Sequence, residues 1–191
     1  MILLTGFEPF GGADTNPSWE AVRLVPDTVC GQEVRRLRLP VEYGRAASLL
    51  REEISRLRPE IVICVGVANG RKAVTPELVA VNYRFAAIPD NAGTAHSGDP
   101  IAPDGPASYM TTLPVHAIID AMKAADVPAH LSLSAGAYVC NDVYYALLAC
   151  EGEFGLRGLF IHVPDAEAVD AETAARALEI ALRTALQIPN S

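Results

Sequence analysis

The 191-residue sequence lacks any hydrophobic run that approaches the roughly 20 apolar residues needed to cross a bilayer. Residues 1–6 carry no basic leader, and their apolar run is too short for a signal peptide. Basic residues are also scarce, since 15 Lys and Arg stand against 23 Asp and Glu, for a net charge of −8. The sequence therefore predicts a cytoplasmic protein that binds neither nucleic acid nor membrane, because both partners reward a basic face.

Cysteine is sparse as well, with four residues whose spacing matches neither a zinc site nor a Cys-x-x-Cys redox pair. In a cytosolic chain of this length we expect free thiols rather than disulfides. Cys64 lies within a strand-like run and Cys150 well inside a helix-like run, which favours packing roles for both. Cys30 lies in a turn-like segment without a visible partner. Cys140 alone lies where a thiol could react.

Half of the residues are hydrophobic and a fifth are charged, which suits one globular domain spanning residues 1–191. Strand-like and helix-like segments alternate, which predicts an α/β fold with a largely parallel sheet. The expected strands are residues 2–5, 33–39, 61–65, 79–85, 129–133 and 158–163. The expected helices are a first helix capped by Asn16 and three others at 41–58, 113–125 and 171–186, with a further helical run at 143–148. Residues 89–106, rich in Pro, Gly, Asp and Asn, predict a long loop.

Four groups of potentially functional residues fall after predicted strands or at a strand-to-helix turn. They are the loop 6–12, the segment 66–71, Cys140 and His162. Because ligands of open α/β sheets bind outside the carboxyl ends of the strands, we expect these groups to meet at one edge.

Cys140 follows the strand-like run 129–133 and precedes the helical run 143–148. The N–H groups at a helix start lower a thiol pKa and favour the reactive thiolate. The alternative is a small buried residue that only packs at the helix start. A catalytic role would require an imidazole within reach, to take or share the thiol proton.

His162 is the best-placed candidate for that imidazole, because it lies near the end of a late strand. A hydrogen-bonded structural histidine is the alternative. His96 lies in a loop, His116 on a helix surface, and His130 at the wrong end of the strand before Cys140.

A third group would orient the imidazole, and spacing leaves Glu77, Asp142 and Asp165 all open. Glu77 also fits a helix start, because it follows Thr-Pro.

The loop 6–12 contains three glycines but fits neither a P-loop nor a dinucleotide fingerprint, since no Gly-Lys-Ser/Thr follows it. Phe7 and Phe10 on this loop suit an apolar clamp around a small flat ligand. The alternative is that both rings plug the end of the sheet.

At this point the sequence resembles the pyrrolidone-carboxylate peptidases, also called type I pyroglutamyl peptidases. The matching segments run through most of the chain: residues 4–12 (Leu-Thr-Gly-Phe-Glu-Pro-Phe-Gly-Gly), 16–20 (Asn-Pro-Ser-Trp-Glu), 75–77 (Thr-Pro-Glu), 88–91 (Ile-Pro-Asp-Asn), 134–141 and 160–164 (Phe-Ile-His-Val-Pro). The resemblance implies a single-domain three-layer α/β/α sandwich with a mostly parallel twisted sheet.

The resemblance also implies a catalytic set, in which Cys140 is the nucleophile, His162 the general acid/base and Glu77 the orienting carboxylate. It implies substrate-binding positions at Phe7, Phe10, Asn16, Val67, Ile88, Tyr138 and Val139. The family removes N-terminal pyroglutamate from peptides through a thioester acyl-enzyme. It needs no metal or cofactor, is cytosolic and is commonly a homotetramer.

Three positions depart from the family pattern. Many relatives carry Gln where Val67 stands, Phe where Tyr138 stands, and Arg where Ala87 stands. The missing arginine would assist charge stabilisation near the reacting carbonyl, so we predict that Arg71 or Arg84 substitutes for it.

These departures keep two alternatives open. One is a related cysteine amidase with shifted specificity, and the other a non-catalytic small-ligand-binding α/β domain.

Overall fold

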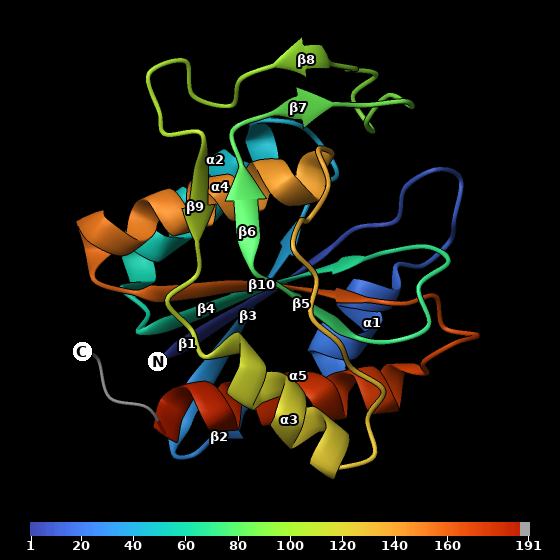
Figure 1. Ribbon diagram of the computed structural model, residues 1–191, viewed down its shortest axis with the longest axis vertical. Coiled ribbons are helices and arrows are strands. Elements are labelled where there is room, and N and C mark those ends of the chain that lie inside the picture. The colour runs from blue at the N-terminus through green and yellow to red at the C-terminus, as the bar shows by residue number, and fades with distance from the viewer. Residues whose placement is uncertain (188–191) are drawn as a thin grey trace.

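The computed structural model describes residues 1–187, so the last four residues of the predicted domain, 188–191, lie outside the described part. The main sheet has six strands in the order β2-β3-β1-β4-β10-β5 (Figure 1). They are β1 (Ile2–Phe7), β2 (Thr28–Val29), β3 (Gln32–Leu39), β4 (Ile61–Val67), β5 (Thr75–Glu77) and β10 (Arg157–Val163). Strands β3, β1, β4 and β10 run parallel, whereas β2 and β5 pair antiparallel at the two edges.

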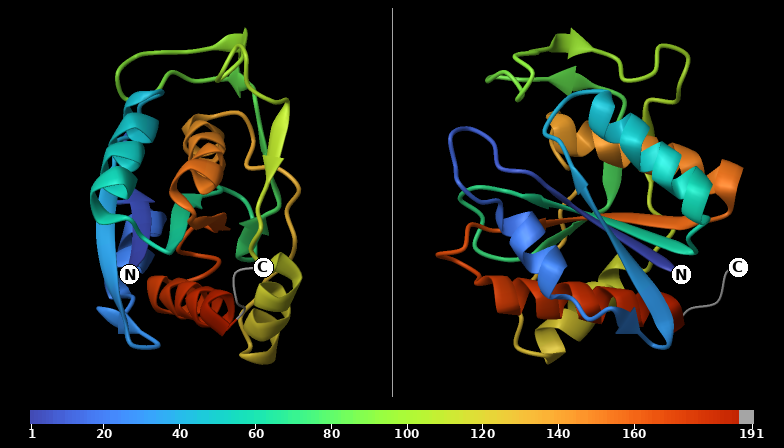
Figure 2. Two further views of the ribbon diagram at one scale, coloured as in Figure 1. Left: turned by 90° about the vertical axis from the view of Figure 1, so that its left-hand side faces the viewer. Right: turned by 180° about the vertical axis from the view of Figure 1, so that it is seen from behind.

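Helices cover both faces of this sheet (Figure 2). They are α1 (Pro17–Leu24), α2 (Arg45–Leu57), α3 (Val115–Ala124), α4 (Val139–Phe154) and α5 (Ala171–Gln187). One apolar core lies between the sheet and α1, α3 and α5, and a second lies between the sheet and α2 and α4. The predicted three-layer α/β/α sandwich is therefore confirmed. No helix formed by residues 1–187 is long and apolar enough to cross a membrane.

Two predicted helices show how local and tertiary signals compete. Asn16 caps α1 as expected, because its side chain accepts from the Ser18 N–H and Pro17 fills the first helical position. The helix predicted from residue 41 begins only at Arg45. The backbone before Arg45 bonds to side chains outside the helix: the N–H of Tyr43 donates to Asp90 and that of Gly44 to Asp142.

The single strand predicted over residues 79–85 is wrong. The structure has two short strands, β6 (Val79–Val81) and β7 (Arg84–Phe85), which pair with β9 (Ser108–Met110) and β8 (Ser97–Asp99). The buried Asn141 side chain causes the break, because it bonds the N–H and C=O of Val81 and the C=O of Tyr83. We call residues 79–110 the arm: β6 and β9 run alongside α4, and the part with β7 and β8 projects beyond α2 and α4 (Figure 1).

The strand predicted at 129–133 is also wrong. This segment is extended but makes only isolated bridges, Val74 with Ala129 and Glu77 with Ser132, alongside β5. The alternative helix start at Thr75–Glu77 is wrong too, since these residues form β5. Pro76 is tolerated there because β5 is an edge strand of the main sheet. Cys140 is therefore reached from an extended segment outside the sheet.

Candidate active site

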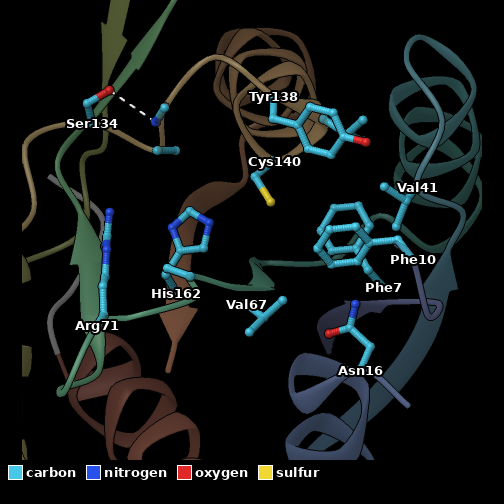
Figure 3. A pocket seen from close by; sticks show the side chains of 14 residues that line it. Phe7, Phe10, Asn16, Val41, Val67, Arg71, Ser134, Tyr138, Cys140 and His162 are labelled. Atoms are coloured by element: carbon cyan, nitrogen blue, oxygen red, sulfur yellow. Dashed lines mark hydrogen bonds between the residues drawn. The ribbon is translucent and has the colours of Figure 1, made fainter. Parts of the chain in front are cut away.

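A cavity of about 270 Å³ lies where β1, β4 and β10 end, as the topology predicted. Its walls come from the loop after β1, the turn after β4, the segment before α4 and the end of β10 (Figure 3). The lining residues are Phe7, Phe10, Asn16, Val41, Val67, Ala68, Arg71, Ser134, Ala135, Gly136, Tyr138, Val139, Cys140 and His162. The volume lies just below the roughly 300–1,000 Å³ of common ligand pockets, which suits a small ligand.

His162, which lines the cavity, forms a buried pair with Glu77, which lies behind it. The imidazole Nδ1 lies 2.7 Å from Oε1 of Glu77, and the two side chains are 5% and 0% exposed. They meet because β10 and β5 are antiparallel neighbours. Since an ionised carboxylate can only accept, Nδ1 carries the proton, and Nε2 is left as the basic nitrogen.

The same carboxylate oxygen also binds Arg71. Nη1 of Arg71 lies 2.7 Å from Oε1 of Glu77 and also donates to the Thr75 hydroxyl. Oε2 of Glu77 is buried without a hydrogen-bond partner among residues 1–187. Arg71 and His162 therefore both donate to the same oxygen of Glu77, and these two bonds fix the orientation of the carboxylate.

Cys140 is the second residue of α4, and its side chain enters the cavity beside His162 (Figure 3). The backbone N–H of Cys140 favours the thiolate and so acts to lower the pKa of this thiol. Asn141 and Asp142 are both fully buried and hold this first helical turn, the former to β6 and the latter to Arg84 and Gly44. The nucleophile candidate thus lies on a firmly anchored element.

Burial opposes the lowering of the thiol pKa that the position of Cys140 at a helix start favours. Loss of solvent, followed by the nearby Glu77 charge, raises the pKa of Cys140 above its ordinary value. Burial also lowers the pKa of His162 below its ordinary value, against the opposing hydrogen bond from Glu77. Both shifts favour the neutral forms of the pair, with the proton on sulfur.

The other end of the cavity is aromatic. Phe7 is buried against Phe160, with ring centroids 6.4 Å apart, and Phe10 faces Tyr138 at 6.4 Å. Val67 and Val139 add aliphatic wall. Figure 3 shows the two phenylalanine rings close together on the side of Cys140 away from Arg71. This end can enclose a small flat ring between apolar surfaces.

Two predicted binding residues, Asn16 and Tyr138, use their polar groups to hold the segments that form the cavity wall. Nδ2 of Asn16 donates to the Glu8 carbonyl, and Oδ1 accepts from Ser18, so this amide fixes the loop that carries Phe7 and Phe10. The Tyr138 hydroxyl donates to the Pro89 carbonyl at 3.1 Å. A phenylalanine at position 138 would lack this tie to the arm.

The structure places the remaining candidates as follows. Ile88 is 53% exposed and does not line the cavity, and Ala87 is exposed beside it. Arg84 pairs with buried Asp142 and does not line the cavity, whereas Arg71 does. Asp165 accepts from the Gly70 N–H and so holds the turn after β4.

Sequence reasoning missed some of the cavity lining. Val41 and the segment Ser134–Gly136 line the cavity, although no role was predicted for them. The run 134–136 could have been found, because it belongs to the matching segment that contains Cys140. Val41 carried no signal, since it was predicted as part of a helix. No group of three or more metal-binding side chains occurs within residues 1–187.

A family model described as "Pyroglutamyl peptidase" matches residues 1–187. The chain belongs to the pyroglutamyl peptidase family. A pyrrolidone-carboxylate peptidase from Levilactobacillus brevis is 45% identical over 165 residues, covering 85% of this chain and 81% of that protein. Another, from Thermococcus onnurineus, is 40% identical and covers 97% of this chain and 98% of that protein.

Solved pyroglutamyl peptidase structures share the fold. Pyroglutamyl peptidase I from Bacillus amyloliquefaciens matches with a TM-score of 0.92 at 38% identity, over 98% of this chain and 97% of that chain. The family resemblance predicted from the sequence is thereby confirmed.

Gly66 makes room for the nucleophile, which gives a first testable prediction. A Cβ at this position would lie 2.9 Å from Sγ of Cys140 and 2.9 Å from Cζ of Phe160. We expect Gly66→Ala to lower the free energy of unfolding by about 1–3 kcal/mol. Displacement of the thiol should also lower kcat/KM by up to about 10²-fold. Urea unfolding and steady-state kinetics measure the two effects.

Gly152→Ala is the matched control, because a Cβ there meets nothing within 4 Å and the residue lies in α4. It should raise the free energy of unfolding by about 0.5–1 kcal/mol and leave kcat/KM unchanged. Wild-type kinetics for Gly66→Ala would contradict the close packing of the thiol.

Proposed function

We propose that this protein is a cysteine omega-peptidase that hydrolyses the amide bond after an N-terminal pyroglutamyl residue of peptides. Family membership and the shared fold support the activity. The observation that carries the residue roles is the convergence of Cys140, His162 and buried Glu77 at one end of an apolar cavity.

The cavity chemistry fits a pyroglutamyl ring, which is a flat, neutral lactam. Phe7 and Phe10 would enclose the ring, with Val67, Tyr138 and Val139 as further wall and Asn16 holding the phenylalanine loop. No acidic side chain lines the cavity within residues 1–187. An ordinary N-terminal ammonium group would therefore enter without a counter-ion, which disfavours unmodified peptides.

The reaction begins with the proton on sulfur. Nε2 of His162 takes the Cys140 proton as the sulfur attacks the carbonyl carbon, and Glu77 stabilises the imidazolium through Nδ1. When the tetrahedral intermediate collapses, the C–N bond breaks and His162 gives its proton to the leaving amine. Water, deprotonated by His162, then attacks the thioester, and the proton returns to sulfur as the C–S bond breaks.

Charge on the intermediate's oxygen would be stabilised by the N–H groups at the start of α4. The backbone N–H of Cys140 has no backbone acceptor in the helix, as is usual for a first-turn donor. Neither predicted substitute for the missing family arginine is suited to this oxygen. Arg84 is committed to Asp142, and Arg71 stands beyond His162 (Figure 3).

The substrate class is tested with two fluorogenic amides of 7-amino-4-methylcoumarin, one pyroglutamyl and one prolyl. They differ at the ring carbonyl and in the charge of the ring nitrogen. We expect the pyroglutamyl amide to be favoured by about 10³-fold or more in kcat/KM, because the apolar cavity offers the prolyl ammonium no partner. Turnover of neither amide would contradict the proposal and favour a non-catalytic domain. Equal turnover would favour the cysteine amidase with shifted specificity.

We also propose a cytoplasmic homotetramer, as the family resemblance implies. Large apolar side chains are exposed on and near the arm, which supports contact with further copies: Tyr83, Phe85, Ile88, Met110 and Leu133. Light scattering on the purified protein measures the assembly, and the mass of a single chain would contradict it.

A further inference from the structure

Arg71 is the cationic residue of the cavity, and its backbone is firmly held. It follows a turn in which Gly70 has a φ of +80° and donates its N–H to Asp165, and the N–H of Ala68 donates to the Val163 carbonyl. These bonds tie the turn after β4 to the end of β10. The guanidinium is therefore presented from a fixed base rather than from a free loop.

Only one nitrogen of this guanidinium is used by the protein. Nη1 binds Glu77 and Thr75, whereas Nε and Nη2 have no hydrogen-bond partner among residues 1–187. The side chain is 30% exposed and lines the cavity. An Nε and Nη2 edge is a planar pair of donors, which matches the two oxygens of a carboxylate.

Arg71 lies on the side of the reacting groups where the leaving part of the substrate would be. Figure 3 shows the phenylalanine rings on one side of Cys140 and His162, and Arg71 on the other. With the lactam between the rings, the scissile carbonyl lies at Cys140 and the leaving amine at His162. The chain of the leaving residue then continues toward Arg71.

The charge of the cavity agrees with an anionic leaving residue. Within residues 1–187, Arg71 is the only Lys or Arg that lines the cavity, and no Asp or Glu lines it. Glu77 lies behind the wall and is already shared by Arg71 and His162. In a dipeptide the free carboxylate is attached to the carbon that bears the leaving amine, so it falls within one residue of His162.

We propose that Arg71 binds the α-carboxylate of the leaving residue and makes pyroglutamyl dipeptides with a free C-terminus the preferred substrates. This inference rests on the proposed peptidase function. It assigns Arg71 to the leaving side of the scissile bond rather than to the oxyanion. Longer peptides and C-terminal amides would be cleaved without this contact.

The test compares pyroglutamyl-alanine with pyroglutamyl-alanine amide, which differ only at the terminal carboxyl group. For the wild type at low salt we expect kcat/KM to be about tenfold higher for the free acid, since one charge-assisted contact distinguishes the two. The ratio should fall as ionic strength rises, because Arg71 is partly exposed. A ratio near one would overturn the inference while leaving the peptidase proposal intact, and cleavage of neither would contradict the peptidase itself.

Variants assign the preference to Arg71. Because Arg71 contacts Glu77, Arg71→Gln is expected to slow both reactions, so the acid-to-amide ratio is the readout, and it should fall to about one. Arg71→Lys, which keeps the charge without the fork, should give an intermediate ratio. Lys72→Gln is the matched control, because Lys72 is an exposed neighbour outside the cavity, and its ratio should equal that of the wild type.

If Arg71→Gln is too slow to assay, the affinity for the two ligands can be measured instead. Titration calorimetry with Cys140→Ala and with Cys140→Ala/Arg71→Gln measures both ligands without turnover. We expect the free acid to bind about tenfold more tightly than the amide only when Arg71 is present. A preference that persists without Arg71 would overturn its assignment.

Discussion

Replacement of Cys140 by serine is expected to lower kcat/KM for a pyroglutamyl amide by at least about 10⁴-fold. The serine hydroxyl would occupy the same place in α4, with the same His162 and Glu77 behind it. It is nevertheless a much weaker nucleophile at neutral pH, and His162, whose pKa burial lowers, is a poor base for so weak an acid. Release of fluorophore measures the loss.

Cys30→Ser is the matched control, because Cys30 is an exposed thiol that does not line the cavity. It should leave kcat/KM unchanged. Circular dichroism and thermal unfolding of Cys140→Ser should match the wild type, since the two side chains are similar in size. Wild-type turnover by Cys140→Ser would remove this thiol from the mechanism and leave the convergence of the three residues without a catalytic explanation.

The parallel core of the fold could be predicted because its strands are buried on both faces. β4 is a continuous apolar run, and β10 is apolar apart from Arg157 and His162. The chain alternates these strands with helices, so both the composition of the strands and their order were informative. From this topology alone, the loop after β1, the turn after β4 and His162 could be expected at one sheet edge. The cavity lies at that edge.

The arm and the segment before α4 could not be predicted in the same way. The short strands of the arm are fixed by long-range side-chain bonds, such as those between Asn141 and Val81 or Tyr83, residues that lie about 60 positions apart in the sequence. The secondary-structure propensity of a short segment does not reveal a hydrogen-bond partner so distant in the sequence. The helix that starts late at Arg45 has the same cause, since buried Asp90 and Asp142 take the preceding N–H groups.

The choice of Glu77 among three acids shows the limit of spacing as evidence. Asp142 is closest in sequence to Cys140, yet it pairs with Arg84. Asp165 is closest to His162, yet it holds the Gly70 turn. Glu77 reaches His162 because an edge strand turns antiparallel to β10, which a Thr-Pro-Glu sequence does not reveal. From the sequence, only the resemblance to the pyroglutamyl peptidases pointed to Glu77 rather than to Asp142 or Asp165.

The sequence left the pKa of the Cys140 thiol open for a related reason. The helix start and the Cys140 N–H do favour the thiolate, but their effect is smaller than that of burial beside Glu77. Burial depends on how the whole cavity closes around the sulfur. A sequence motif can therefore place a nucleophile without giving its protonation state.

Replacement of Glu77 by glutamine is expected to lower kcat/KM by about 10³-fold. Both Nδ1 of His162 and Nη1 of Arg71 are donors, so the amide oxygen must take the place of Oε1 to serve them. The amide NH₂ group would then lie at Oε2, which has no hydrogen-bond partner among residues 1–187, as an unsatisfied buried donor. The imidazolium formed during attack would also lose its counter-charge.

The pH profile separates this role from a merely structural one. In the wild type, burial places the acid limb of kcat/KM below pH 6.5, because the imidazole must be neutral to accept the thiol proton. The hydrogen bond and charge of Glu77 raise the pKa of His162, so their removal should move the acid limb to still lower pH. Asp142→Asn is the matched control, because it removes another fully buried carboxylate outside the cavity lining. It should lower the free energy of unfolding without moving the limb, whereas an unmoved limb in Glu77→Gln would contradict the pairing of Glu77 with the catalytic imidazole.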